Sequence, residues 1–191
     1  MSAPAADLAP DPRYPLGTLA AALAAPPRDF PDCVWTIARF PEEVRNAVEG
    51  LSPKQLRRRY RPGSWTVRQV VHHCADSHQH AMMRVKWALT APAGVVPEVA
   101  GYDEAACAEL PDYGLPLAPT LRLLDGLHAR FAALLDGLDG RQRARTYFHT
   151  GHGRAFSVAQ TAVMYDWHCR HHLAHVRIAL GKRVRPSWRP H

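Results

Sequence analysis

The sequence predicts an all-α protein, a four-helix bundle with one long crossover loop and an irregular N-terminal arm. Three observations indicate this class: four segments carry apolar residues at helical spacing, a proline-rich stretch separates the second segment from the third, and no series of strand-like segments is present. The chain has 191 residues, 47% of them hydrophobic, so it can bury a core as one domain without disulfide bonds or structural metals.

The N-terminal part of the chain predicts an arm followed by the first helix. Residues 1–31 contain seven prolines, so we expect an irregular arm that contributes no catalytic element. The bundle is expected to occupy residues 32–181, followed by a short tail at residues 182–191. Within residues 32–51, apolar side chains fall close to helical spacing on both sides of Pro41. This pattern predicts a first helix that is kinked at Pro41 or begins there.

The second helix is expected from Trp65 to about Thr90, with Ser64 as its N-cap. At about 100° per residue, one face of this helix is apolar. That face comprises Val67, Val71, Cys74, His78, Ala81 and Val85. Residues 91–118 follow with four prolines, which predicts a long crossover rather than a tight hairpin.

The remaining two helices are separated by a short connection. Leucines at a/d-like spacing predict the third helix at residues 119–138. Residues 145–156 include two glycines and predict a turn or a short hairpin. The fourth helix is expected from Ser157 to about Leu180, with Gly181 as its C-terminal stop.

Composition narrows the function classes. No apolar run is long enough for a membrane helix, and the leader does not resemble a secretory signal, so no membrane partner is expected. The formal net charge of +7 and the arginine-rich residues 57–61 would suit an anionic partner. Because no nucleic-acid-binding signature accompanies them, we expect these arginines to form a solvated surface stretch and expect no nucleic-acid partner. Four scattered cysteines without a C-x-x-C pair are typical of reduced thiols in a cytoplasm.

Histidine carries most of the functional signal, with 12 residues concentrated in the second and fourth expected helices. His168 and His172 are four residues apart, so their side chains project one turn apart from the same side, as in helical pairs that grip one metal ion. His171 and His175 repeat this spacing. However, the helical angle places His171 about 160° from the inward apolar stripe. We therefore expect His168 and His172 to be the ligands.

A third ligand must come from a facing helix, because metal sites in bundle cores are built in that way. His73 lies nearer the apolar face of its helix than His72 does, so His73 completes the predicted set of metal ligands. Three neutral imidazoles leave coordination positions open, which is typical of a catalytic metal, and either zinc or nickel would suit them. Asp76, three residues after His73, is the candidate that orients an imidazole or acts as a base, although an exposed helix acid would show the same spacing.

Five strings of this sequence resemble the DinB superfamily, and especially its YfiT-like branch of metal-dependent hydrolases and bacillithiol S-transferases. They are YPLG at 14–17, RPGSWTVRQVVHHCADSH at 61–78, GYDE at 101–104, LHARFAALLDGL at 127–138 and YDWHCRHHLAH at 165–175. The resemblance implies a four-helix bundle, a homodimer, and a divalent metal, zinc or nickel, on three histidines that correspond to His73, His168 and His172. It also implies relatives that use low-molecular-weight thiols such as bacillithiol.

Three functions are compatible with this site. In the leading hypothesis, the metal lowers the pKa of a bound thiol cofactor, bacillithiol or another, and the thiolate attacks an electrophilic small molecule. In the second, the same metal activates water for hydrolysis. A non-catalytic metal-binding or ligand-binding bundle is the third. No carboxylate stands beside the histidine pair in an H-E-x-x-H register, since residue 169 is Cys169, and this favours transfer.

Overall fold

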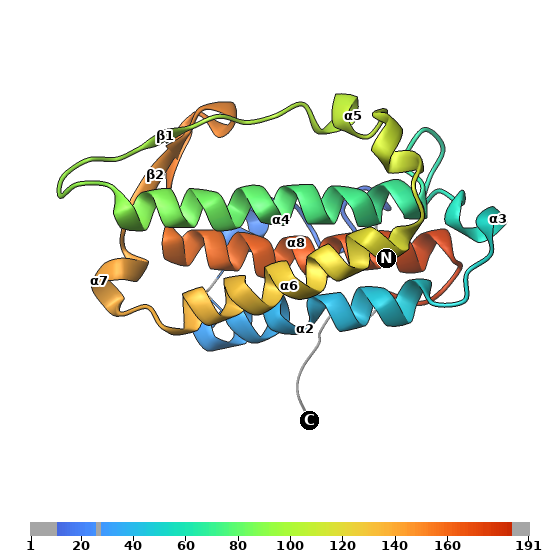
Figure 1. The fold of residues 1–191 in the computed structure, drawn as a ribbon, viewed down its shortest axis with the longest axis horizontal. Coiled ribbons are helices and arrows are strands. Elements are labelled where there is room, and N and C mark those ends of the chain that lie inside the picture. The colour runs from blue at the N-terminus through green and yellow to red at the C-terminus, as the bar shows by residue number, and fades with distance from the viewer. Residues whose placement is uncertain (1–10, 26–27, 185–191) are drawn as a thin grey trace, which may run out of the picture.

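The protein is a four-helix bundle, as the sequence predicted (Figure 1). The computed structural model describes residues 11–25 and 28–184. Its four long helices are α2 (Phe30–Val48), α4 (Val67–Thr90), α6 (Leu117–Asp136) and α8 (Val158–Ala179). Helices α2 and α4 each pack against both α6 and α8, so the four helices enclose a common core.

The two helices that carry the histidine clusters begin at well-defined caps. At α4 the Thr66 hydroxyl accepts from the Gln69 N–H at 3.2 Å, and the Gln69 side chain accepts from the Thr66 N–H at 3.0 Å. The predicted N-cap Ser64 is therefore wrong, because the Ser64 hydroxyl donates to the Arg61 carbonyl at 2.8 Å in the preceding turn. At α8 the predicted start is confirmed to within one residue, with Ser157 as the N-cap.

Helix α2 runs through Pro41 instead of beginning there. A proline inside a helix has no N–H to donate to the carbonyl four residues earlier, which in this helix belongs to Ile37. Both residues are buried in the bundle. The Ile37 carbonyl oxygen is thus available to another hydrogen-bond donor in the core.

Short elements connect and cover the bundle. They are α1 (Leu19–Ala24) in the arm, α3 (Pro53–Leu56), β1 (Glu98–Val99), α5 (Glu104–Cys107) and the 3₁₀ helix η1 (Pro111–Gly114) before α6, and α7 (Gly140–Arg143), β2 (Thr146–His149), η2 (Thr150–His152) and β3 (Arg154–Ser157) before α8. The predicted hairpin is confirmed: β2 and β3 are antiparallel, with Tyr147 opposite Phe156.

The crossover runs along α4 and is not wholly irregular (Figure 1). Its strand β1 pairs in parallel with β2, which joins the crossover to the hairpin in a small sheet of order β1-β2-β3. The predicted arm is also not wholly irregular, because α1 packs against α8. Residues 1–10, 26–27 and 185–191, which include most of the predicted tail, lie outside the described residues.

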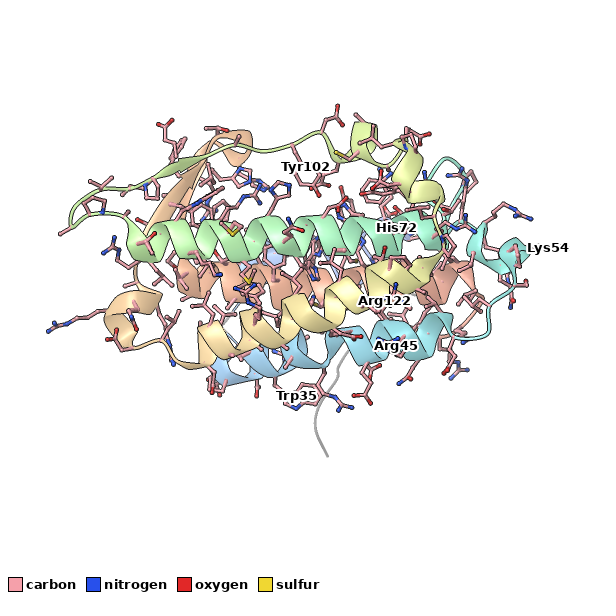
Figure 2. All side chains as sticks on the ribbon, in the orientation of Figure 1. Trp35, Arg45, Lys54, His72, Tyr102 and Arg122 are labelled. Atoms are coloured by element: carbon pink, nitrogen blue, oxygen red, sulfur yellow. The ribbon has the colours of Figure 1, made fainter. Side chains whose placement is uncertain are left out.

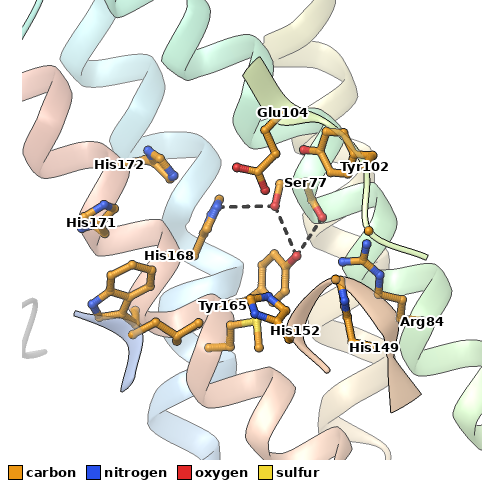
Figure 3. A pocket seen from close by; sticks show the side chains of 15 residues that line it. Ser77, Arg84, Tyr102, Glu104, His149, His152, Tyr165, His168, His171 and His172 are labelled. Carbon is orange, nitrogen blue, oxygen red and sulfur yellow. Dashed lines mark hydrogen bonds between the residues drawn. The ribbon is translucent and has the colours of Figure 1, made fainter. Parts of the chain in front are cut away.

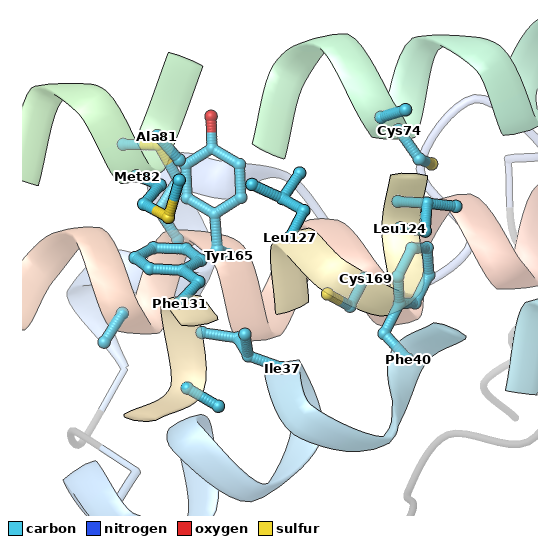
Figure 4. Close-up of a cluster of buried hydrophobic side chains, with 14 of the residues drawn as sticks. Ile37, Phe40, Cys74, Ala81, Met82, Leu124, Leu127, Phe131, Tyr165 and Cys169 are labelled. Atoms are coloured by element: carbon cyan, nitrogen blue, oxygen red, sulfur yellow. The ribbon is translucent and has the colours of Figure 1, made fainter. Parts of the chain in front are cut away.

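The core lies between the four helices (Figure 4). Ile37, Phe40, Leu124 and Phe131 are fully buried, and the predicted apolar face of α4 is buried along its whole length. Charged side chains such as those of Lys54 and Arg122 are exposed (Figure 2). No helix in the described part of the chain has the length and apolar character needed to span a membrane.

Candidate metal centre

Helices α4 and α8 bring three histidines together at the centre of the bundle. His73 comes from α4, while His168 and His172 come from α8, and one ring nitrogen of each lies within 4.8 Å of those of the other two. The Nε2 atoms of His73 and His168 are 3.3 Å apart. Two nitrogens that bind one tetrahedral zinc ion at about 2.05 Å would also lie about 3.3 Å apart. The structure therefore assembles the three predicted ligands with a spacing that fits one divalent ion.

The protonation of these imidazoles also suits a metal. Burial, and after it the neighbouring His175, lowers the pKa of His73 to about 4. Burial followed by the other histidines lowers the pKa values of His168 and His172 well below the ordinary value. The rings are thus neutral near pH 7, which is the form that binds a metal.

A line of hydrogen bonds runs from α2 through the core to His168. The Nδ1 atom of His128 lies 2.6 Å from the Ile37 carbonyl oxygen, the one that Pro41 leaves without a helical donor. The Nε2 atom of His128 lies 2.7 Å from Nδ1 of His78. The Nε2 atom of His78 lies 2.9 Å from Nδ1 of His168. His78 and His128 are at most 1% exposed, so no water competes for these nitrogens.

This line fixes which nitrogen of His168 carries the proton. A carbonyl oxygen only accepts, so His128 must donate from Nδ1 and, being neutral, accept at Nε2. His78 must then donate from Nδ1 and accept at Nε2, and His168 must donate from Nδ1. The lone pair of His168 is therefore on Nε2, the atom that faces His73. The ligand residue is presented to a metal in the correct tautomer before any metal arrives.

A second group of histidines adjoins the first on α8. His171, His172 and His175 also have ring nitrogens within 4.8 Å of one another. The helical angle places His171 about 160° from the inward apolar stripe of α8, yet this residue is only 6% exposed. Trp167 stacks on it with ring centroids 4.3 Å apart, and the Trp167 indole N–H donates to the Gly17 carbonyl of the arm at 3.2 Å. The arm and Trp167 thus bury His171, which the helical angle alone did not predict.

The other candidates from the sequence have different partners. The Nδ1 atom of His72 lies 2.7 Å from the Thr120 hydroxyl oxygen of α6, so His72 turns away from His168. The Asp76 carboxylate accepts from the Tyr113 hydroxyl of η1 at 2.7 Å. Asp76 is not among the residues that line the cavity beside the histidines. Its position favours a role in fastening the crossover to α4 over a role as a base at the metal.

A cavity of about 420 Å³ lies beside His168 and His172 (Figure 3). Residues of α4, the crossover, the hairpin and α8 line it. Its polar and charged lining consists of Ser77, Arg84, Tyr102, Glu104, His149, His152, Tyr165, His168, His171 and His172. The Ser77 hydroxyl lies 3.4 Å from Nε2 of His168 and 3.2 Å from the Tyr165 hydroxyl oxygen. A small molecule in this cavity would lie against the metal-facing histidines.

Sequence reasoning missed Arg84 and Glu104 as site residues. Glu104 is the second of the two acids in the GYDE string on the crossover, and the path of that loop along α4 places its carboxylate in the cavity lining (Figure 3). The residue as a whole is exposed, but partial burial of its carboxylate raises the pKa of Glu104, and the charge of Arg84 opposes that shift. The site therefore contains a carboxylate suited to accept a proton, although none is adjacent to the histidine pair in sequence.

Known proteins resemble this chain over most of its length. The DinB superfamily model matches residues 36–176. A protein of Geobacillus thermodenitrificans named "Putative metal-dependent hydrolase" is 37% identical over 177 residues, which cover 92% of this chain and 96% of that protein. A protein of Oceanobacillus iheyensis with the same description is 42% identical over 140 residues, or 73% of this chain and 79% of that protein.

A solved structure supports the same relationship. YfiT from Bacillus subtilis, described as "a probable metal-dependent hydrolase with an unusual four-helix bundle topology", superposes with a TM-score of 0.79 at 33% sequence identity. The match covers 90% of this chain and 99% of YfiT. With the family model spanning residues 36–176 and relatives aligned over almost their whole length, the chain belongs to the DinB superfamily.

Proposed function

We propose that this protein is a divalent-metal-dependent enzyme that transfers a low-molecular-weight thiol to an electrophilic small molecule. His73, His168 and His172 hold the ion, zinc or nickel. The observation that carries the proposal is the cluster of these three neutral imidazoles, two of which, His168 and His172, lie in the wall of a cavity of about 420 Å³ that is large enough for a small substrate. A divalent ion bound there supplies a positive charge that lowers the pKa of a thiol or of water.

The described residues provide a proton acceptor in the cavity but no thiol. Cys33, Cys74 and Cys169 are at most 1% exposed, and no cysteine lines the cavity. The thiol must therefore come from a cofactor such as bacillithiol. Glu104, with its raised pKa, accepts the S–H proton. A bond then forms between the sulfur and the electrophilic carbon, and the leaving group departs with its bonding electron pair.

Hydrolysis is the second candidate, and two observations favour it. The relatives in Geobacillus and Oceanobacillus carry the name "Putative metal-dependent hydrolase". Glu104 also supplies the carboxylate whose absence from the histidine motif argued against hydrolysis in the sequence. In that reaction Glu104 accepts a proton from water instead of from a thiol.

Homodimer formation stays a prediction.

The metal assignment is tested by replacing His73, His168 and His172 together with alanine. We expect metal content measured by elemental analysis to fall from one ion per chain to background, while helical circular dichroism is retained. His72→Ala is the matched control, because this neighbour of His73 bonds to Thr120 and should leave metal content unchanged. Full metal content in the triple variant would overturn the assignment.

The reaction is tested with the metal-loaded wild-type protein. Loss of an electrophile such as monochlorobimane is followed with and without a panel of small thiols, and esters and amides are tested without thiol. Thiol-dependent loss that disappears on chelation and returns with zinc or nickel supports transfer. Ester or amide cleavage without thiol supports hydrolysis instead, and metal binding without either activity leaves a non-catalytic binding protein.

A further inference from the structure

Arg84 is a buried cation in the cavity wall that forms no ion pair with the described residues. Its residue is 7% exposed, and its Nη2 donates to the Ala100 carbonyl at 3.0 Å. Across residues 11–25 and 28–184, no carboxylate lies within ion-pair distance of its guanidinium. Removing a charge from water without a counter-charge is unfavourable. Such a cation at a ligand cavity needs an explanation.

Holding the crossover against α4 does not account for it. That contact uses one of the five N–H donors of the guanidinium. A neutral amide could make the same bond without bringing a charge into the wall. The planar fork of the guanidinium matches the two oxygens of a carboxylate, and such a charge-assisted pair would compensate its charge.

No ion pair within the described residues compensates the charge of Arg84, although that charge acts on Glu104 from a distance and opposes the rise in its pKa. His149 and His152 line the same part of the cavity (Figure 3). Burial, and after it the charge of Arg84, lowers the pKa of His149 to about 4 and also lowers that of His152. Both rings are therefore neutral near pH 7. Glu104 is the one carboxylate in the cavity lining, and it does not reach Arg84 to form an ion pair.

We propose that Arg84 binds a carboxylate of the substrate, so that the small thiol used by this enzyme is an anionic one. This inference rests on the proposed function and names the class of thiol. Ser77 and Arg84 are seven residues apart on α4, a rise of about 10 Å along the helix. Ser77 contacts His168, whereas Arg84 lies toward the hairpin end of the same cavity. A thiol that also carries a carboxylate can bring its sulfur to the histidines while its other end reaches the guanidinium.

The test compares an anionic thiol with its neutral analogue on the cobalt-loaded full chain. N-acetyl-L-cysteine and N-acetyl-L-cysteine amide are titrated separately, and the cobalt–thiolate absorption band reports sulfur binding without turnover. In the wild type we expect the acid to bind about tenfold more tightly than the amide, the effect of one charge-assisted hydrogen-bonded pair. Arg84→Gln should remove that preference, while Arg84→Lys, which keeps the charge but loses the fork, should retain part of it.

A second measurement keeps the inference separate from the thiol chemistry. Thermal unfolding of the same proteins is followed with N-acetyl-L-alanine or its amide, which carry no sulfur. The acid should raise the midpoint for wild type but not for Arg84→Gln. If neither thiol gives the cobalt band, thiol transfer is refuted, and this second measurement still decides the role of Arg84. Equal binding of acid and amide by wild type, or a preference that persists in Arg84→Gln, would overturn the inference.

Discussion

Replacing His78 with leucine tests whether the histidine line sets the tautomer of a metal ligand. Leucine removes the acceptor that now lies 2.9 Å from Nδ1 of His168. The Nδ1–H group is then buried without a partner, and the ring is free to rotate or to move its proton to Nε2. We expect weaker metal binding, although neither His78 nor its partner His128 is itself a proposed ligand.

The size of the effect follows from the groups left unpaired. A buried donor without an acceptor costs about 1–3 kcal/mol. Loss of a hydrogen-bond partner behind a metal ligand typically weakens metal affinity about 10- to 100-fold, equivalent to about 1.4–2.7 kcal/mol. His78→Gln is the matched control, because its amide oxygen can take the place of Nε2 and accept from His168. We expect this variant to retain most of the wild-type affinity.

Two measurements decide the outcome. Competition with a chromophoric chelator gives zinc affinity for wild type, His78→Leu and His78→Gln. Nitrogen-15 NMR of the metal-free wild-type protein should show His168 protonated at Nδ1. Unchanged zinc affinity in His78→Leu, or a His168 proton on Nε2 in the wild type, would refute the reasoning.

Two further predictions concern Asp76, which the structure places outside the cavity lining, and the stability of the metal-free protein at acid pH. Asp76→Asn should lower the free energy of unfolding measured in urea by about 1 kcal/mol, because it weakens the hydrogen bond from Tyr113. Metal content and turnover should stay close to wild type. A tenfold loss of turnover with metal retained would restore Asp76 as a catalytic candidate. Burial is the largest cause that lowers the pKa of His128 and His175 to about 4 and that of His171 to about 3. Below pH 6.5 the unfolded chain therefore binds more protons at these residues than the folded protein does. Through these three histidines alone, metal-free protein should lose about 3.5 kcal/mol of stability between pH 6 and pH 5, and other buried histidines such as His73 add to that loss. Urea midpoints that do not change over this range would contradict the shifts.

The long helices could be predicted because their residues report burial directly. Each buries a face whose spacing is visible in the sequence, such as the face of α4 from Val67 to Val85. The starting residue of α4 was less visible. Ser64 and Thr66 are both good capping residues, and only the side chain of Gln69 three residues after Thr66 decides between them.

The metal ligands were accessible for the same reason, since His73, His168 and His172 lie where helical angle and packing agree. His171 was not, because its burial depends on the arm and on Trp167 and not on the periodicity of α8. Arg84 and Glu104 were missed because only the path of the crossover brings both into the lining of one cavity. The spacing of residues within one helix cannot predict which side chains of a long loop will pack against that helix.

Pro41 shows how a local signal can have a distant meaning. In the sequence it indicates a kink or a helix start, both of which are statements about α2 alone. In the fold its missing N–H leaves the Ile37 carbonyl free to accept from His128, and that bond directs the protons of His78 and His168. Pro41 on α2 therefore helps to place the lone pair of His168 on Nε2. It does so through the line of hydrogen bonds and needs no contact with the proposed metal site.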